Sequence, residues 1–507
     1  MFKSFEIISK IDVDAKSLSM IYTPGVGVSC QKIAEDVENS WVLTNRINSI
    51  AVISTDYTKS LKRAIFLKDA LQIDAYPFEI SDLSQIKFVV ENLEPSFKGF
   101  DLSLCDNLEN ISFDIELPVL TNQKVDLKDF FGTISRTLFM KNVDNFSGDI
   151  KEKSLQLREF AGGVLEIQLC EEKRKKPIAI ISDGSAVLGF GNIGAHAGLP
   201  VMEGKAVLFK TLGDVDAIPL CVKTQDENEI IKLVKLLSNS FSGINLEDIC
   251  APKCFTIEKT LINELNIPVF HDDQHGAAIV VLAGLLNSCH LVNKKLDEIK
   301  VAISGAGAAA QALAKLLLFA GVKNIIMSDI DGIVYKGRKE NNQSLEEIAE
   351  ITNLENLKGN LKDSIKNADV FIGLSAPNLV DEKMIKSMAK NPIVFALANP
   401  VPEIMPDVAQ KAGAFIVGTG RSDFDNQINN SLAFPGLFRG LLAHNINKIT
   451  DEMKLECAFA IASCVNDEDL AVDYIIPNAL DIRVSDKICE LLKNFAWPYG
   501  VYALNYI

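Results

Sequence analysis

The stretch VAISGAGAAAQALAKLLLFAG, residues 301–321, decides the fold of the C-terminal half of the chain. Its pattern predicts an apolar strand, a Gly-x-Gly-x-x-Ala turn and an amphipathic helix. Gly305 would make the tight turn, Gly307 would let backbone amides approach a pyrophosphate, and Ala310 would let the helix pack closely on the strand. These features favour a dinucleotide-binding unit over a turn that only serves helix packing.

A second apolar run follows this helix and ends in Asp329. An acid at the end of this strand would accept a hydrogen bond from a ribose 2′-hydroxyl and would repel a 2′-phosphate. The following Ile330 and Asp331 offer no arginine for a phosphate. We therefore expect NAD as the cofactor, with NADP as the alternative.

Outward from this stretch, residues 301–420 alternate short apolar runs with helix-length segments, the pattern of a parallel sheet covered by helices on both faces. Similar runs (PIAIISDG, DAIPLCVK, IPVF) make the middle of the chain α/β as well, and the last segments are predicted to be helices. The predicted parts are an N-terminal α/β domain over residues 1–276, a Rossmann-type doubly wound domain over 277–445 and a helical segment over 446–507.

The composition is that of a globular protein, since 507 residues with 48% hydrophobic residues are enough to build two or three cores. The 67 acidic residues against 51 Lys and Arg give a net charge of −16, which repels nucleic-acid phosphates. The N-terminal stretch carries acidic residues where a signal peptide would be apolar, and no apolar run is expected to reach the length of a membrane span. Ten scattered cysteines are typical of buried thiols, so we expect a cytoplasmic protein.

The chain also contains a degenerate internal repeat. IAVIS at residues 50–54 matches IAIIS at 178–182 with an offset of 128, and IDAYP matches VDAIP with Asp74 opposite Asp216, an offset of 142. SFKGFDL then matches SFSGINL, and ELPV matches NIPV. The offset grows because the first copy lacks about fourteen residues, which fall on the glycine-rich GSAVLGFGNIGAHAG of the second copy. We predict an intact second copy and a first copy without this loop.

Four carboxylates follow strand-like runs; they are Glu247 and Asp248 in NLEDIC and Asp272 and Asp273 in PVFHDDQHG. Carboxylate oxygens at strand ends are the ligands that Mg²⁺ or Mn²⁺ prefers, with positions left for substrate oxygens. The alternatives are a helix N-cap with a solvated loop, or a zinc site that uses His271 and His275. The residues alone leave metal binding open.

Lys205 follows LPVMEG and leads into the apolar run AVLF, an unusual place for an ammonium group. Burial beside a cationic metal would lower its pKa and make it a usable general base. The alternative is a lysine that extends its charged end to solvent from the end of a helix or strand.

Jointly, eight motifs resemble the malic enzymes, specifically their small bacterial type. They are YTPGVG at Tyr22, SDGSAVLGFGNIG at Ser182, GLPVMEGKAVLFK at Gly198, GINLEDI at Gly243, IPVFHDDQHGAAIVVLAGLL at Ile267, GAGAAA at Gly305, FALANPVPEIMP at Phe395 and TGRSDFDNQINNSLAFPG at Thr419. The resemblance covers residues 1 to about 50 and about 176 to the end. So many motifs in one order make coincidence implausible.

The resemblance implies oxidative decarboxylation of malate to pyruvate and CO₂ by a homo-oligomer, a dimer, with NAD(P) and Mg²⁺ or Mn²⁺. It implies Lys205 as general base, Tyr22 as the acid that protonates C3, and Asp272 as the residue that orients Lys205. The implied metal ligands are Glu247, Asp248 and Asp273, and the positions implied to hold the substrate carboxylate or the nicotinamide end are Asn399 and Asn430. A malolactic-type enzyme that releases lactate and a catalytically inactive scaffold are the alternatives.

Two positions depart from the patterns of malic enzymes. Asn192 stands in GFGNIG where an acid is usual, and Ala186 stands where the larger malic enzymes have a substrate-binding arginine. Small malic enzymes resemble this chain at Ala186, so the substrate carboxylate must be recognised from elsewhere, with Arg421 as a candidate.

The third departure is an insertion over residues about 55–175, which ordinary small malic enzymes do not have and which contains much of the first repeat copy. Projection through the offsets puts Arg63 opposite Lys205, and an arginine cannot serve as the base. The positions opposite the four carboxylates hold side chains that cannot bind a divalent cation: Ser103, Leu104, Asn122 and Gln123. The first copy is therefore predicted to keep its apolar frame and to have lost its chemistry.

The second copy has instead lost the tyrosine. KSLSMIYTPGVG at Lys16 aligns with KSLQLREFAGGV at Lys153, an offset of 137, which puts Glu159 opposite Tyr22. One hypothesis is a fused pseudo-dimer of substrate domains in which Tyr22 of the first copy reaches the Lys205 site of the second, because in small malic enzymes the tyrosine is thought to come from a neighbouring subunit. The other hypothesis is an insertion that only thickens an interface, with Tyr22 reaching Lys205 in some other way.

Overall fold

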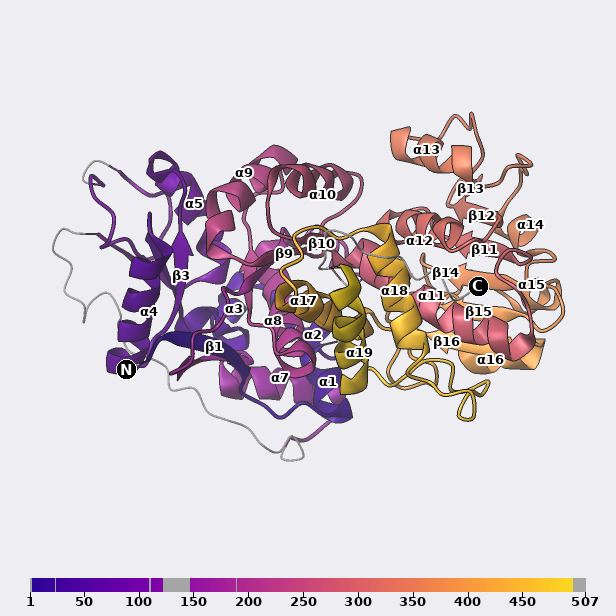
Figure 1. The fold of residues 1–507 in the computed structure, drawn as a ribbon, viewed down its shortest axis with the longest axis horizontal. Helices are drawn as coiled ribbons and strands as arrows, with labels where there is room; N and C mark the ends of the chain where they lie inside the picture. Colours follow the sequence, from indigo (N-terminus) through magenta and orange to yellow (C-terminus); the bar gives the residue numbers. More distant parts are fainter. Residues whose placement is uncertain (1, 23, 109–110, 122–145, 188, 496–507) are drawn as a thin grey trace. The chain divides into compact units, whose positions relative to one another are not determined.

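The computed structural model describes residues 2–495 except 23, 109–110, 122–145 and 188 (Figure 1). The chain divides into two compact units, Met1–Phe270 and His271–Ile507. The predicted α/β class is confirmed, because both units are built on parallel strands connected by helices. Asn122 and Gln123 lie outside the described residues.

The first unit is built around two four-stranded sheets with the same topology. The first sheet has the order β3 (Asp74–Glu79), β2 (Ser49–Ser54), β4 (Gly99–Asp101) and β5 (Val119–Leu120). The second has β8 (Ala217–Cys221), β7 (Ile178–Ser182), β9 (Gly243–Leu246) and β10 (Val269–His271), reading from the other end of its order. In each sheet the strand that comes first in the chain pairs in parallel with the next two strands.

The registers of the two sheets correspond as well. Ile50 is paired with Ala75 in the first sheet, and Ile178 is paired with Ala217 in the second, which are the residues related by the offsets of 128 and 142. Strands β2 and β7 are buried along their whole length, as expected for the centre of parallel sheets covered on both faces. The matching sequence segments therefore form strands at equivalent places in their sheets.

The helices after β2 and β7 show where the offset changes. Residues 55–56 connect β2 to α4 (Tyr57–Leu71), whereas residues 183–193 connect β7 to α8 (Gly194–Gly213), and the glycine-rich stretch supplies this longer connection. The other helices and strands of the unit are β1 (Ser4–Ser9), α1 (Ala15–Ile21), α2 (Val26–Glu35), α3 (Ser40–Leu43), α5 (Ile86–Leu93), α7 (Ile150–Ala161), β6 (Leu165–Cys170), α9 (Glu227–Leu237) and α10 (Lys253–Glu264).

Strands β1 and β6 form an antiparallel ribbon in which Ile7 is paired with Ile167. The Ile7 N–H donates to Asp216 Oδ1 (2.9 Å), directly before β8 of the second sheet. The Ile167 N–H donates to Asp74 Oδ1 (3.4 Å) at the start of β3 in the first sheet. Strand β1 is thus bonded to the second sheet, and strand β6 is bonded to the first sheet.

The second unit contains a six-stranded sheet in which only the pair of β12 and β13 is antiparallel. Its order is β13 (Gly332–Ile333), β12 (Asn324–Asp329), β11 (Lys300–Ser304), β14 (Val370–Gly373), β15 (Ile393–Ala396) and β16 (Ile416–Thr419). Its helices are α11 (Asp272–Val292), α12 (Ala308–Phe319), α13 (Gln343–Ile351), α14 (Leu361–Ile365), α15 (Glu382–Lys386), α16 (Pro406–Ala412), α17 (Phe434–Ala443), α18 (Asp451–Ala462) and α19 (Ile482–Leu492). This is the predicted Rossmann-type sheet, and α18 and α19 pack on α11 and α17 of the same unit.

Helix α11 is long and apolar enough to cross a membrane by length and composition alone. The expectation that no apolar run reaches that length is therefore wrong. The run is long because α11 is a core helix: residues 280–285 are all buried, and the helix packs against α12 and α18. A helix that is apolar on all sides is typical of the core of a large domain as well as of a membrane.

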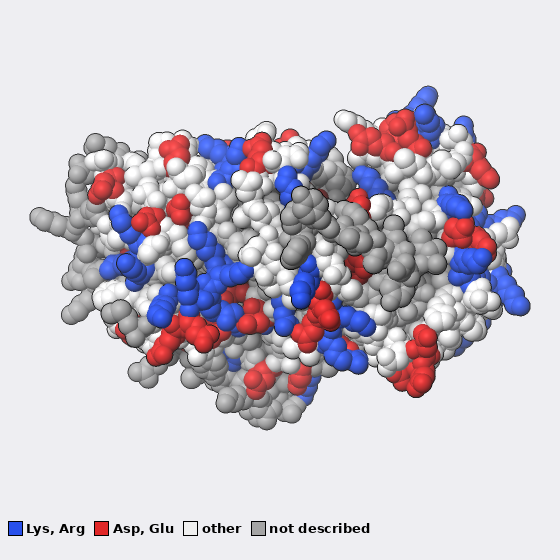
Figure 2. Space-filling model, in the orientation of Figure 1, with Lys and Arg blue, Asp and Glu red and all other residues white. Residues whose placement is uncertain are grey.

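Charged side chains are mixed on the face of the molecule shown in Figure 2, where basic and acidic groups lie next to each other in many places. Adjacent opposite charges neutralise each other locally. The net charge of −16 is thus not gathered into one acidic field on this face.

Candidate active site

The centre of the candidate site is a buried ion pair between Lys205 and Glu247. Lys205 lies on α8 with no exposure to solvent, and Glu247 directly follows β9 with 2% exposure. The second carboxylate oxygen of Glu247 accepts a hydrogen bond from Asn245 Nδ2 (3.0 Å). Because a buried ammonium is costly without an opposite charge, this pairing explains how the helix carries a lysine in an apolar run.

Three carboxylates gather beside this lysine at the ends of β9 and β10. One ligand oxygen from each of Glu247, Asp248 and Asp273 lies within 4.8 Å of the other two. Such close negative charges repel one another unless a cation or proton compensates them. Three hard oxygen donors are the ligands that Mg²⁺ or Mn²⁺ prefers.

The loop SDGSAVLG holds Asp248 in place. Asp248 has a φ of 53°, an uncommon left-handed conformation for a residue other than glycine. The Ala186 N–H donates to its carbonyl oxygen (2.9 Å), and the Cys250 N–H donates to Ser185 Oγ (2.9 Å). Ser185 in turn donates to Asp183 (2.6 Å), so the loop that includes Ala186 shapes the carboxylate group.

Tyr22 lies against helix α8 of its own chain. It follows α1 directly, and it is 4% exposed. A Cβ atom placed on Gly204 would lie 3.4 Å from Tyr22 Cδ2 and 2.3 Å from the carbonyl oxygen of Ile21. Only a glycine at position 204 allows this approach, which brings Tyr22 to the residue next to Lys205.

Asp272 and Asn430 are joined by a hydrogen bond in the second unit, with Asn430 Nδ2 as the donor. Gly276 makes room for it, because a Cβ there would lie 1.8 Å from Asp272 Oδ1 and 3.3 Å from the Asn430 Cβ. Sequence reasoning assigned these two residues separately, one to Lys205 and one to the substrate. The structure shows that Asn430 also orients the Asp272 carboxylate.

The glycine-rich turn has the form that a bound pyrophosphate needs. Gly305 has a φ of +112°, and a Cβ on it would lie 2.4 Å from the carbonyl oxygen of Leu374. Gly307 is the N-cap of α12, and nothing lies within 4 Å of where its Cβ would be. Ala310 is buried, as expected for a residue that allows the helix to pack closely. The N-terminus of α12 is thus open to an anionic group, which fits a dinucleotide.

Asp329 at the end of β12 has a partner that sequence reasoning missed. Arg338 Nη1 donates to Asp329 Oδ1 (2.7 Å), and Nη2 donates to Oδ2. Arg338 also donates to the carbonyl oxygen of Gly332 (3.2 Å), at the start of β13. The residues directly after Asp329 are Ile330 and Asp331. The fold nevertheless brings an arginine from further along the chain next to the predicted ribose-binding acid.

Asn399 and Arg421 lie near one another in the second unit. Arg421 Nη1 donates to the carbonyl oxygen of Pro400 (3.0 Å), directly after Asn399. Its other nitrogens donate to both carboxylate oxygens of Asp423 (2.8 and 2.6 Å). A substrate carboxylate at Arg421 would therefore compete with Asp423, whereas Asn399 Oδ1 has no hydrogen-bond partner among the described residues.

Asn192 forms a reciprocal amide pair with Gln225, with distances of 2.9 and 2.8 Å. Gln225 Nε2 also donates to the carbonyl oxygen of Asp183 (3.1 Å). An acid at position 192 would lose one of the two amide hydrogen bonds. Asn192 is therefore linked through Gln225 to the main chain of Asp183, which precedes Ser185 and Ala186 in the loop.

The equivalent positions in the first sheet form a different arrangement. Arg63 Nε donates to Asp101 Oδ2 (2.8 Å), and Ser103 Oγ donates to Asp101 Oδ1 (2.6 Å). Leu104 packs against the apolar cluster beneath. In the first sheet, Arg63 and Asp101 thus form an ion pair with each other.

A Rossmann-type sheet with an open glycine turn, in a chain that also buries a lysine among carboxylates, defines a nicotinamide-dependent oxidoreductase. Family models described as "Malic enzyme, NAD binding domain" and "Malic enzyme, N-terminal domain" match residues 274–495 and 141–262. The chain belongs to the malic enzyme family. Residues 1–140, which include Tyr22, lie outside the matched ranges.

Individual relatives agree with the family models. The chain is 52% identical over 325 residues to a bifunctional malic/malolactic enzyme of Bacillus subtilis, covering 64% of this chain and 79% of the relative. It is 51% identical over 328 residues to an NAD-dependent malic enzyme of Geobacillus stearothermophilus, covering 65% and 68%. The crystal structure of an NAD-dependent malic enzyme from Thermotoga maritima matches with a TM-score of 0.61 and 50% identity, covering 63% of this chain and 84% of that one.

Proposed function

We propose that this protein catalyses the oxidative decarboxylation of malate to pyruvate and CO₂, with NAD as the hydride acceptor and NADP as the alternative. The observation that carries the proposal is the buried Lys205 paired with Glu247 within a group of three carboxylates. Relatives described as NAD-dependent and NADP-dependent malic enzymes support the choice of substrate and cofactor.

Glu247, Asp248 and Asp273 would hold the divalent cation. A cation at this place supplies electrostatic stabilisation for negative charge on the substrate oxygens. The donor set of three carboxylates supports Mg²⁺ or Mn²⁺.

Lys205 and Tyr22 would transfer the protons of the reaction. In its neutral form, Lys205 Nζ would accept the proton of the C2 hydroxyl. A nicotinamide cofactor, when bound, would supply the acceptor for the C2 hydride. The bond between C3 and C4 then breaks, C4 leaves as CO₂, and Tyr22 gives a proton to C3. The position of Tyr22 beside Gly204 supports this pairing of acid and base.

The remaining predicted residues would bind and orient. Asp272, which accepts a hydrogen bond from Asn430, would orient Lys205. Asn399 would contact the substrate or the nicotinamide end, and Asp329 would accept a hydrogen bond from the adenosine ribose.

The proposal is tested by NADH formation from malate with Mn²⁺, in the presence and absence of a chelator. We expect activity that the chelator abolishes. Lys205→Ala should be inactive, whereas Lys210→Ala on the same helix, which removes a lysine paired with Glu6 and Asp214, should retain activity. Lactate formation without NADH would instead indicate a malolactic enzyme, and the absence of both products would contradict an enzymatic role with malate.

A further inference from the structure

Arg158 joins separate segments in the interior of the first unit. It lies on α7, and its side chain has no exposure to solvent. Its Nη1 donates to Glu203 Oε2 (3.1 Å), and its Nη2 donates to the carbonyl oxygens of Ile21 (3.0 Å) and Pro200 (2.9 Å). One guanidinium group therefore ties the end of α1 to helix α8.

Helix α7 holds the end of α1 at two points. Ser154 Oγ donates to the carbonyl oxygen of Met20 (2.6 Å), and Arg158 donates to that of Ile21. The last carbonyl groups of a helix have no partner inside the helix, and Tyr22 follows directly after them. Helix α7 therefore fixes the main chain that carries Tyr22.

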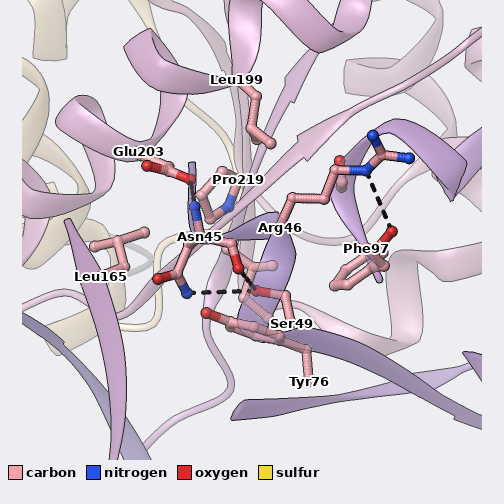
Figure 3. A pocket seen from close by; sticks show the side chains of 11 residues that line it. Asn45, Arg46, Ser49, Tyr76, Phe97, Leu165, Leu199, Glu203 and Pro219 are labelled. Atoms are coloured by element: carbon pink, nitrogen blue, oxygen red, sulfur yellow. Dashed lines mark hydrogen bonds between the residues drawn. The ribbon is translucent and has the colours of Figure 1, made fainter. Parts of the chain in front are cut away.

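The carboxylate opposite Arg158 is fixed from its other side. Glu203 is 1% exposed, and its Oε1 accepts a hydrogen bond from the Asn45 N–H. Figure 3 shows Glu203 and Asn45 next to each other at a small cavity. Because Lys205 lies two residues after Glu203 on α8, the contact with Arg158 also fixes the part of the helix that carries the candidate base.

Packing alone does not explain an arginine at this place. The residue that matches Arg158 at the offset of 137 is the apolar Ile21. Burial raises the pKa of the Glu203 carboxyl, and Arg158 counteracts this rise. Buried ion pairs are often no more stabilising than well-packed apolar side chains, so the directed hydrogen bonds of Arg158 point to a role in geometry.

We propose that Arg158 is a positioning residue, whose hydrogen bonds hold Tyr22 in a fixed place relative to Lys205. This inference rests on the proposed function, in which Tyr22 gives a proton to C3. Helix α7 belongs to the segment that has Glu159 where the matching segment has Tyr22. The segment with α7 thus has no tyrosine of its own, but it holds the main chain that carries Tyr22 in the matching segment.

Arg158→Leu tests the inference, because leucine is apolar and makes no hydrogen bonds through its side chain. The step that needs Tyr22 is measured by the exchange of the pyruvate methyl protons with deuterium, followed by NMR with Mn²⁺ and NADH. We expect the exchange rate to fall about tenfold or more, as in Tyr22→Phe. The decarboxylation of oxaloacetate breaks the bond between C3 and C4 without a proton from Tyr22, so its rate and the KM for malate should stay near the wild-type values.

Two control variants separate geometry from charge and from general stability. Arg158→Lys keeps the charge but lacks the planar fork that reaches several acceptors, so it should lose exchange as well. Arg174→Leu removes an arginine that binds Asp216 elsewhere in the unit and should exchange at the wild-type rate.

An unchanged exchange rate in folded Arg158→Leu would overturn the inference. A parallel loss of exchange, oxaloacetate decarboxylation and thermal stability would also overturn it, since Arg158 would then be only structural. If the wild-type protein neither oxidises malate nor exchanges pyruvate protons, the proposed function itself is wrong, which is a different result from a failure in the variants alone.

Discussion

Replacing Gly204 by alanine should displace Tyr22 from the candidate site. The added Cβ would lie 2.3 Å from the carbonyl oxygen of Ile21. Carbon and oxygen atoms in close contact are about 3.3 Å apart, so the end of α1 or helix α8 must move by about 1 Å. The obstacle is main chain, and Arg158 binds the same carbonyl oxygen, so no side chain can simply rotate away.

The size of the effect follows from this displacement. A misplacement of about 1 Å between reacting groups lowers the rate about 100-fold, and we expect this loss in kcat with malate. Overpacking should cost about 1–3 kcal/mol of unfolding free energy. Alanine offsets about 1 kcal/mol of this cost because it favours a helix more than glycine does. The variant should therefore remain folded while it loses activity.

Steady-state NADH formation and a thermal unfolding curve measure the two effects. Gly198→Ala is the matched control on α8, because its Cβ would meet Gly184 Cα and Val187 Cγ2 at an ordinary 3.6 Å. It should keep the wild-type kcat. A Gly204→Ala protein with wild-type kcat would refute the role given to the contact between Tyr22 and α8.

Asp329→Ser should raise the ratio of kcat/KM for NADP to kcat/KM for NAD about tenfold or more, because it removes the acid and releases Arg338 for a 2′-phosphate. An unchanged ratio would contradict the role of Asp329 in selecting the cofactor. Asp273→Asn should weaken Mn²⁺ binding about tenfold or more, because one of three anionic ligands is lost; titration followed by electron paramagnetic resonance measures it, and wild-type affinity would exclude Asp273 as a ligand. Burial lowers the pKa of Lys10 from 10.5 to about 8. Between these pH values the unfolded chain holds this proton while the folded protein releases it, so the free energy of unfolding rises with pH. The cost of burying the charge is therefore fully present below pH 8 and is lost towards pH 10.5. Relative to Lys10→Met, the wild-type protein should gain about 3 kcal/mol of unfolding free energy across that window in urea titrations, and equal pH slopes would contradict this prediction.

The second unit could be predicted from sequence because its signals are local. The strand, the turn at Gly305 and the helix after it are consecutive, and each has its own periodicity. The offsets between IAVIS and IAIIS and between IDAYP and VDAIP likewise identified residues that occupy equivalent registers in two sheets. Local pattern and self-comparison were therefore enough for the fold class.

Contacts between distant segments could not be predicted in this way. Arg338 reaches Asp329 because β13 turns back antiparallel on β12. The Asp331-Gly332 pair favours such a turn, but it does not indicate which later side chain will meet Asp329. Arg158 lies more than a hundred residues from Ile21, in a segment that sequence reasoning characterised only by its missing tyrosine. The directions of such side chains depend on the packing of α1, α7 and α8 against one another, which the offsets do not encode.

The most direct test of the central claim uses malate labelled with ¹³C at C4, together with NAD and Mn²⁺. The proposed function predicts that the label appears in CO₂ and that NADH and pyruvate form in equal amounts. Label that stays in a four-carbon product would show oxidation without decarboxylation, and labelled CO₂ with lactate in place of NADH and pyruvate would show a malolactic reaction. Either result would contradict the function proposed for Lys205 and Tyr22.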